Sequence, residues 1–240
     1  MIFGNVPVAS RRQPWLPSLR WWRWLLFAVI CLYSFPYFDK LPSVQEMVND
    51  ISAEVLAAAA EAIRQGGIVA FPTETYYGLA VDALDAQALQ RLFALKGRGG
   101  AKASALLVAD FVMFSELCAE VSSRAHELAA RHWPGPLTLA LPARSHLPAA
   151  IVADGCVAAR VSSHPVAHAL VVAAGRPITA TSANPAGTAP ARTAEQVRAY
   201  FAGQDFHLLD GGPTPGGPPS TLVRVTGAEV AILRQGAVLL

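Results

Sequence analysis

The stretch LKGRGGAKAS at residues 95–104 places cations among glycines, a pattern that suits phosphate binding. Lys96 and Arg98 can converge on one anion where a helix ends, and Lys102 adds a third cation. The glycines allow the backbone to approach a ligand closely. A Walker A loop is excluded, because that motif needs a glycine before its lysine and a hydroxyl after it, whereas alanines flank Lys102. A solvated surface loop remains the alternative.

Hydroxyl and amide side chains follow two short apolar runs. In FPTETYYG (71–78) threonines flank Glu74, and in ITATSANPAG (178–187) Ser182 and Asn184 follow a buried run. Such groups beyond the end of a strand can bind a ligand in an open α/β sheet. Ordinary turns are the alternative in both places, since Asn-Pro and Pro-Ala-Gly are common in turns.

Arg160 stands within the apolar run VAARV (157–161). An arginine inside an apolar strand is rarely left unpaired, so we expect a carboxylate or a phosphate as its partner. That partner is either a ligand or an Asp or Glu of the protein. Ser220 and Arg234, from later stretches, join Arg160 in this candidate anion site. The glycine- and proline-rich loop 210–220 is interpreted as a lid or wall of a site.

Several familiar kinds of site are disfavoured. His164 and His168 are four residues apart, but no H-E-x-x-H glutamate or third ligand supports a zinc site. The chain has neither a G-x-S-x-G hydrolase elbow nor a G-x-G-x-x-G turn after a strand. Its 3 cysteines include no C-x-x-C pair, which argues against a disulfide framework or a thiolate zinc site and fits a reducing compartment.

The charge of the chain is unevenly distributed. The net charge is +2, and residues 1–40 carry five cations against Asp39, so the remainder is −2, the difference between +2 and +4. A domain without net positive charge is not expected to hold nucleic acid by counterion release. Phosphate chemistry must then depend on a few well-placed cations. A hydrophobic content of 53% excludes a disordered protein.

Alternating helix and strand signals from residue 49 onward must position these groups. Capping residues and apolar spacing predict helices after Asp50 or Ser52, after Asp85, over 122–133, over 165–174 and after Thr193. Short apolar runs predict strands at 68–71, 104–109, 137–141, 157–161, 177–180, 207–210, 220–225 and 229–234. Some neighbouring strands are too close for a crossover helix, so we predict one α/β domain with a mixed β-sheet and helices packed on it.

Residues 1–48 differ in kind from the rest of the chain. Residues 11–38 hold arginines, tryptophans and an apolar run that Pro36 interrupts, and the run is shorter than the about 20 residues that a membrane span needs. No cleavage site of a secretory signal follows it. We predict an N-terminal extension over 1–48, either an amphipathic segment on a membrane surface or not native, followed by a folded domain over 49–240.

Seven stretches, taken in order, resemble one family: PTETYYGL, KGR…K, WPGPLT, VAARVSSHP, TSAN, DGG…PSTLV and LRQG. Together they are similar to the YrdC-type threonylcarbamoyl-AMP synthases over residues 51–236. The resemblance implies a twisted, open α/β sheet with a concave basic cavity. It also implies a nucleotidyltransferase that joins L-threonine, bicarbonate or CO2, and ATP, and releases pyrophosphate. The product would serve t6A formation at position 37 of ANN-decoding tRNAs, through a separate threonylcarbamoyl transferase in the cytoplasm.

The resemblance also implies roles for individual residues. Threonine would be held by Thr75, Arg160, Ala180 and Ser220, with Arg160 pairing its carboxylate. ATP would be held by Lys96, Arg98, Lys102, Cys156, Ser182, Asn184, Pro190 and Arg234. Mg²⁺ is implied as the ion that accompanies ATP. No side chain is assigned as a general acid, a general base or a metal ligand.

Two other functions stay open. One is carbamoyl-adenylate formation, as in the similar domain of hydrogenase-maturation carbamoyltransferases, whose acylphosphatase and zinc-finger modules are not found in this sequence. The other is a noncatalytic RNA-binding or regulatory protein, against which the charge of the domain argues. Indirect contact with tRNA and association with a membrane surface through residues 11–38 are further expectations.

Overall fold

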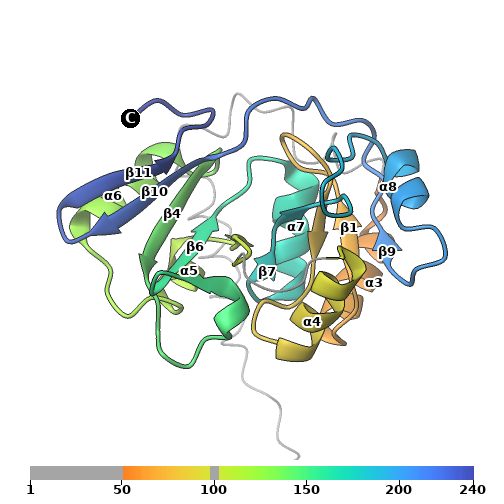
Figure 1. The fold of residues 1–240 in the computed structure, drawn as a ribbon, viewed down its shortest axis with the longest axis horizontal. Helices are drawn as coiled ribbons and strands as arrows, with labels where there is room; N and C mark the ends of the chain where they lie inside the picture. Colours follow the sequence, from red (N-terminus) through yellow and green to blue (C-terminus); the bar gives the residue numbers. More distant parts are fainter. Residues whose placement is uncertain (1–50, 98–102) are drawn as a thin grey trace, which may run out of the picture. The chain divides into compact units, whose positions relative to one another are not determined.

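The computed structural model describes residues 51–97 and 103–240 (Figure 1). The extension predicted over 1–48 and its boundary with the domain lie outside the described residues, as do the predicted ATP-binding residues Arg98 and Lys102. Within the described part of the chain, no helix combines the length and the apolar character needed to cross a membrane.

The predicted α/β fold is confirmed, and its strands form two mixed sheets. The smaller sheet has the order β8-β2-β1-β9, with β1 and β9 parallel and the other pairs antiparallel. The larger has the order β11-β10-β4-β6-β3-β7, and β5 also pairs with β6. The strands are β1 (Val69–Phe71), β2 (Gly78–Ala80), β3 (Leu106–Leu107), β4 (Leu137–Pro142), β5 (Val152–Ala153), β6 (Cys156–Arg160), β7 (Ile178–Thr179), β8 (Thr181–Ser182), β9 (His207–Leu208), β10 (Thr221–Thr226) and β11 (Glu229–Arg234).

The helices begin where capping residues predict. The side chains of Ser52, Asp85, Ser122 and Thr193 each accept a hydrogen bond from a backbone N–H in the first turn that follows. The helices are α3 (Ala53–Arg64), α4 (Ala86–Leu95), α5 (Phe111–Ser115), α6 (Ser123–His132), α7 (Pro165–Ala174) and α8 (Ala194–Tyr200), with a 3₁₀ turn η2 (Ala149–Ile151). The sequence did not predict α5 and η2, which are too short to show an apolar period.

Two apolar clusters hold these elements together. The larger joins one face of the seven-stranded sheet to α5 and α6, through residues such as Leu106, Leu137, Leu139, Val157, Val223, Phe114 and Leu128. The smaller lies between α3 and α7 and reaches β1, β3 and β7, through residues such as Ile63, Phe71, Leu107, Leu170 and Ile178. Figure 1 shows α3 and α7 beside β1 and β7, and α5 and α6 near β4 and β6.

The seven-stranded sheet has a buried face and a partly open face. On β6 and β10 the buried positions alternate with positions that keep some exposure to solvent. Because side chains alternate along a strand, the second set shares the face opposite to α5 and α6. We call this surface the open face; on these two strands it comprises Cys156, Ala158, Arg160, Leu222, Arg224 and Thr226.

Candidate functional site

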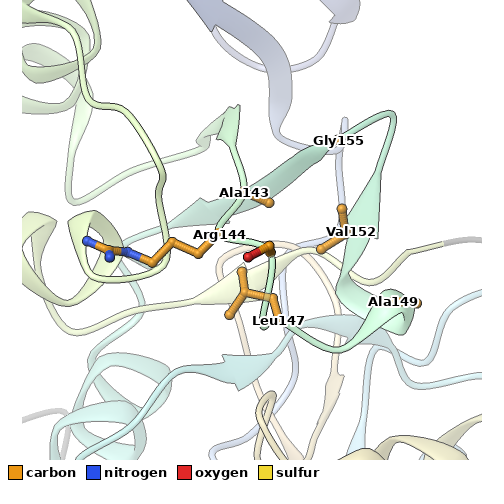
Figure 2. Close-up of a pocket in the computed structure, with 7 residues that line it drawn as sticks. Ala143, Arg144, Leu147, Ala149, Val152 and Gly155 are labelled. Atoms are coloured by element: carbon orange, nitrogen blue, oxygen red, sulfur yellow. The ribbon is translucent and has the colours of Figure 1, made fainter.

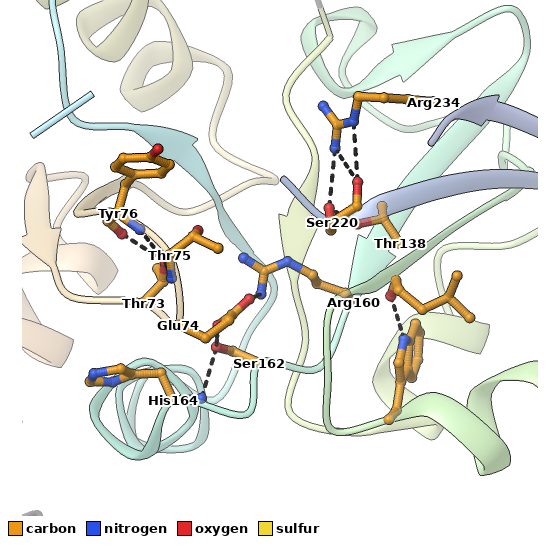
Figure 3. Close-up of polar contacts among 12 residues, drawn as sticks. Thr73, Glu74, Thr75, Tyr76, Thr138, Arg160, Ser162, His164, Ser220 and Arg234 are labelled. Carbon is orange, nitrogen blue, oxygen red and sulfur yellow. Dashed lines mark hydrogen bonds and ion pairs between the residues drawn. The ribbon is translucent and has the colours of Figure 1, made fainter. Parts of the chain in front are cut away.

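The turn after β1 is held by the hydroxyl group of its own first threonine. Thr73 Oγ1 donates to the carbonyl oxygen of Tyr76 at 2.6 Å and accepts from the backbone N–H groups of Thr75 and Tyr76, each at 3.3 Å. A threonine that bonds the backbone two and three residues ahead stabilises a turn. This turn therefore presents Glu74 and Thr75 at fixed positions (Figure 3).

Glu74 pairs with Arg160, the last residue of β6. Arg160 Nη1 lies 2.7 Å from Glu74 Oε1, and the two side chains are 11% and 16% exposed. Glu74 Oε2 accepts a 2.6 Å hydrogen bond from Ser162 Oγ. The sequence left open whether the partner of Arg160 is a ligand or an acid of the protein, and the structure supplies Glu74. Ser162 was missed; its place just beyond the strand end was the available signal.

Arg160 keeps N–H donors that a ligand can use. Its Nη1 makes the 2.7 Å ion pair with Glu74 and has no other polar partner in the described residues. Burial lowers the pKa of the Arg160 guanidinium, Glu74 raises it and nearby Arg234 lowers it further. An arginine stays charged at neutral pH and has five N–H donors. Arg160 is thus a largely buried cation that can bind a further anion.

Ser220, just before β10, lies at the centre of a second polar group. Ser220 Oγ is 2.8 Å from Thr138 Oγ1. Arg234 Nη2 donates to Ser220 Oγ at 3.1 Å and to the Ser220 carbonyl oxygen at 2.9 Å. Figure 3 shows Arg160 between this group and Glu74. The structure therefore brings together three residues that the sequence placed in separate stretches, and adds Thr138, which the sequence did not indicate.

Lys96, just after α4, is almost completely buried, with 1% exposure. Its ammonium group donates to the backbone carbonyl oxygens of Ser182 and Asn184, the latter at 2.9 Å. Ser182 Oγ donates to Asn184 Oδ1, and Asn184 Nδ2 donates to the Thr188 carbonyl oxygen at 2.6 Å. Three residues predicted to bind ATP thus form one connected group, in which the lysine shapes the segment 182–188.

The other predicted residues lie at different places around these groups. Ala180 lies between β7 and β8, where the chain passes from the larger sheet to the smaller. Pro190 lies beside β8, because the residue after it donates a 3.2 Å backbone hydrogen bond to Ala183. Cys156 begins β6, at the opposite end of that strand from Arg160. The ligand-binding roles of these three residues, like those of the other predicted site residues, stay predictions.

The loop 210–220 lies against the turn after β1. The Gly216 N–H donates to the Thr75 carbonyl oxygen at 2.7 Å. The Tyr77 hydroxyl donates to the Gly212 carbonyl oxygen at 2.8 Å. Burial raises the pKa of Tyr77 to about 12, so the phenol stays protonated and remains a donor at neutral pH. These contacts support the interpretation of the loop as a wall of the site.

A cavity of about 340 Å³ lies away from these groups (Figure 2). It is lined by Ala143, Arg144, Ser145, Leu147, Ala149, Val152 and Gly155, which follow β4 and precede β6. Among the described residues that the sequence assigns to threonine or ATP, none lines it. We therefore take the candidate site to be the Arg160 end of the open face.

Known proteins resemble this chain over most of its length. The Sua5, YciO and YrdC family, described as telomere recombination, matches residues 61–236. A Pyrococcus abyssi protein named threonylcarbamoyl-AMP synthase is 40% identical over 195 residues, which cover 81% of this chain and 56% of that protein. A Marinobacter nauticus protein of the same name is 36% identical over 177 residues, which cover 72% of this chain and 93% of that protein.

A solved structure agrees with these sequence matches. The crystal structure of P. abyssi Sua5 complexed with L-threonine has a TM-score of 0.71 at 40% identity, and the match covers 75% of this chain and 54% of that one. This chain thus spans about half the length of the P. abyssi protein, at 56%, and most of the M. nauticus protein, at 93%. With its family match over residues 61–236, the chain belongs to the Sua5, YciO and YrdC family.

Proposed function

We propose that this chain is a threonylcarbamoyl-AMP synthase, which joins L-threonine, CO2 or bicarbonate, and ATP and releases pyrophosphate. The observation that carries the proposal is the placement of Arg160 between the Thr75 turn and the Ser220 group. A buried guanidinium with unused N–H donors suits the carboxylate of an amino acid, and nearby hydroxyl groups suit its other polar atoms. The family membership and the threonine-bound relative support this choice of amino acid.

The proposed reaction needs threonine with a neutral amine. The amine adds to CO2 and loses one proton to give a carbamate, and a carbamate oxygen then attacks the α-phosphorus of ATP as the bond to pyrophosphate breaks. Both oxygens of Glu74 already contact Arg160 or Ser162, so Glu74 is not an unpaired acceptor for the ammonium form. The positive charges of Arg160 and Arg234 favour loss of the ammonium proton and stabilise the carbamate. We therefore assign no general base.

ATP would bind beside the threonine site, since the carbamate must reach the α-phosphorus. The residues that would form its site, by direct contact or by holding the segment 182–188 in place, are those that the family resemblance assigns: Lys96, Arg98, Lys102, Cys156, Ser182, Asn184, Pro190 and Arg234. Mg²⁺ would arrive with the phosphates. Among residues 51–97 and 103–240, no group of three or more His, Cys, Asp or Glu side chains could hold a metal ion, and no step is assigned to the ion. The protein's part is to position the reactants and neutralise charge.

The product would pass to a separate threonylcarbamoyl transferase complex for t6A modification of ANN-decoding tRNAs. Contact with tRNA would then be indirect. We propose a cytoplasmic enzyme, and association with a membrane surface through residues 11–38 is a separate expectation. Sedimentation of the full chain with anionic liposomes would test that expectation.

The test of the function is pyrophosphate release from ATP by the purified full chain, with and without threonine and bicarbonate. We expect release that requires both. Arg160→Met should lower kcat/KM for threonine by about 100-fold, the scale for losing one partner of a buried charge pair. Arg131→Met is the matched control, because Arg131 is exposed on α6, and it should keep the activity.

Two other results would contradict the proposal. Pyrophosphate release that depends on carbamoyl phosphate in place of threonine and bicarbonate would indicate carbamoyl-adenylate formation. Binding of tRNA with no release under any substrate combination would indicate a noncatalytic RNA-binding protein.

A further inference from the structure

The open face carries a second arginine that the site described above does not use. Arg224 of β10 lies opposite Ala140 of β4 and Ala231 of β11. Ala140 in turn lies opposite Ala158 of β6. Directly opposed residues share a face, so one row across four strands consists of three alanines and Arg224. The residues that flank Arg224 in this row are alanines, and their methyl groups offer its guanidinium no hydrogen-bond acceptor.

No partner for Arg224 is found in the described part of the chain. Its guanidinium makes no ion pair or hydrogen bond with any residue of 51–97 or 103–240. Yet β10 is an interior strand, between β4 and β11, and Arg224 is only partly exposed. A guanidinium has five N–H donors, and on this face the neighbouring strand positions offer them no side-chain acceptor. An anionic ligand would supply the missing partner.

The arginines of the open face form two groups, with Arg160 and Arg234 in one and Arg224 in the other. Arg234 is close enough to lower the pKa of Arg160. Arg224 acts at the other end of β6, where it lowers the pKa of the Cys156 thiol against the effect of burial. Arg234 lies opposite Leu222, two residues before Arg224 on the same strand. Two residues span about 7 Å along a strand, so an anion that contacts both Arg234 and Arg224 must be longer than a carboxylate.

We propose that Arg224 binds the phosphate chain of the nucleotide and extends the cationic surface that begins at Arg234. A guanidinium binds phosphate oxygens through parallel, charge-assisted hydrogen bonds. Glu74 is already paired with Arg160, so it does not compete for Arg224. The inference rests on the proposed function for the identity of the nucleotide as ATP.

Calorimetric binding to the full chain tests this role, with ATP, inorganic pyrophosphate and adenosine as probes. Arg224→Gln should weaken the binding of ATP and pyrophosphate about tenfold and leave adenosine unchanged, as expected when one charge-assisted pair is lost. Arg224→Lys keeps the positive charge but lacks the planar set of guanidinium donors, so the affinity for ATP and pyrophosphate should fall about threefold. Arg131→Gln removes the same charge from an exposed helix position and should change none of the three.

Two results would overturn the inference. One is an unchanged affinity of Arg224→Gln for ATP and pyrophosphate. The other is a loss of adenosine binding with pyrophosphate binding intact, which would place Arg224 against the base. If Arg224→Gln does not fold, Arg224→Lys makes the same comparison. If the wild-type chain binds ATP but shows no threonine-dependent release, the proposed function fails, while the binding comparison still decides the role of Arg224.

Discussion

Arg160 and Lys96 are both largely buried cations of the candidate site, but the protein surrounds them differently. Arg160 faces a carboxylate, with Nη1 2.7 Å from Glu74 Oε1. Lys96 donates to the backbone carbonyl oxygens of Ser182 and Asn184. A carboxylate compensates the charge of its partner, whereas a carbonyl oxygen accepts a hydrogen bond through its dipole.

The different partners of Arg160 and Lys96 indicate two different roles in ligand binding. A guanidinium has five N–H donors in a planar fork, so Arg160 can contact Glu74 and still bind an anion. An ammonium group has three donors, and Lys96 directs donors to the segment that holds Ser182 and Asn184. We therefore expect Arg160 to act by direct contact with threonine and Lys96 to act by fixing the surface against which the phosphates bind.

Removing the charge of Glu74 should disturb this arrangement most. Glu74→Gln keeps the shape but leaves Arg160 without its counter-charge, which should lower the free energy of unfolding by about 3 kcal/mol. The KM for threonine should rise about tenfold as Arg160 loses its position, with the KM for ATP unchanged. Urea denaturation and steady-state kinetics measure the two effects.

A matched control for Glu74 is Glu61 of α3, whose 2.8 Å ion pair with Arg64 lies on the surface. Exposed pairs contribute little to stability, so Glu61→Gln should change neither the unfolding free energy nor the KM values measurably. Equal increases in the KM for threonine and for ATP in Glu74→Gln would show general disruption of the site and would contradict a positioning role.

Replacing Lys96 should have the next largest effect and should act on the other substrate. Lys96→Met leaves the carbonyl oxygens of Ser182 and Asn184 without their donor, at a cost of about 2 kcal/mol in unfolding free energy. The KM for ATP should rise and the KM for threonine should stay constant. Weaker ATP binding with an unchanged Tm would instead make Lys96 a direct phosphate ligand and remove the contrast with Arg160.

The smallest expected effect concerns His164, which follows Ser162 beside the Arg160 pair. Burial lowers the pKa of His164 below its ordinary value of 6.5, and Glu74 opposes this shift. Its buried Nδ1 has no hydrogen-bond partner in the described residues. The unfolded chain therefore takes up the proton first, and stability is lost as the pH falls from about 6.5 toward the pKa of the folded state.

His164→Gln should remove this part of the pH dependence, measured as the unfolding free energy at about pH 7.5 and pH 5.5. His132, whose pKa burial also lowers, keeps a contribution of the same sign. The slope should therefore decrease without vanishing. An unchanged slope would mean that His164 is protonated equally in the folded and unfolded chains.

The sequence was most informative where structure depends on near neighbours. Ser52, Asp85 and Thr193 cap helices as predicted, since capping acts within one turn. Arg160 was identified because an arginine inside an apolar run demands a partner. Thr138 was missed because a hydroxyl group inside a strand carries no signal of its own, and Ser162 was missed although it lies just beyond the end of β6.

By itself the sequence determined the α/β fold class and the starts of the longer helices, and it singled out Lys96, Arg160 and Arg234 as candidate cations, because these depend on local spacing and on residue type. Only the tertiary structure decided what each cation does. Glu74 reaches Arg160, and Lys96 reaches Ser182, through the packing of strands and turns that are far apart in the chain. Such pairing depends on strand register and on how two sheets meet, which no short window of sequence contains.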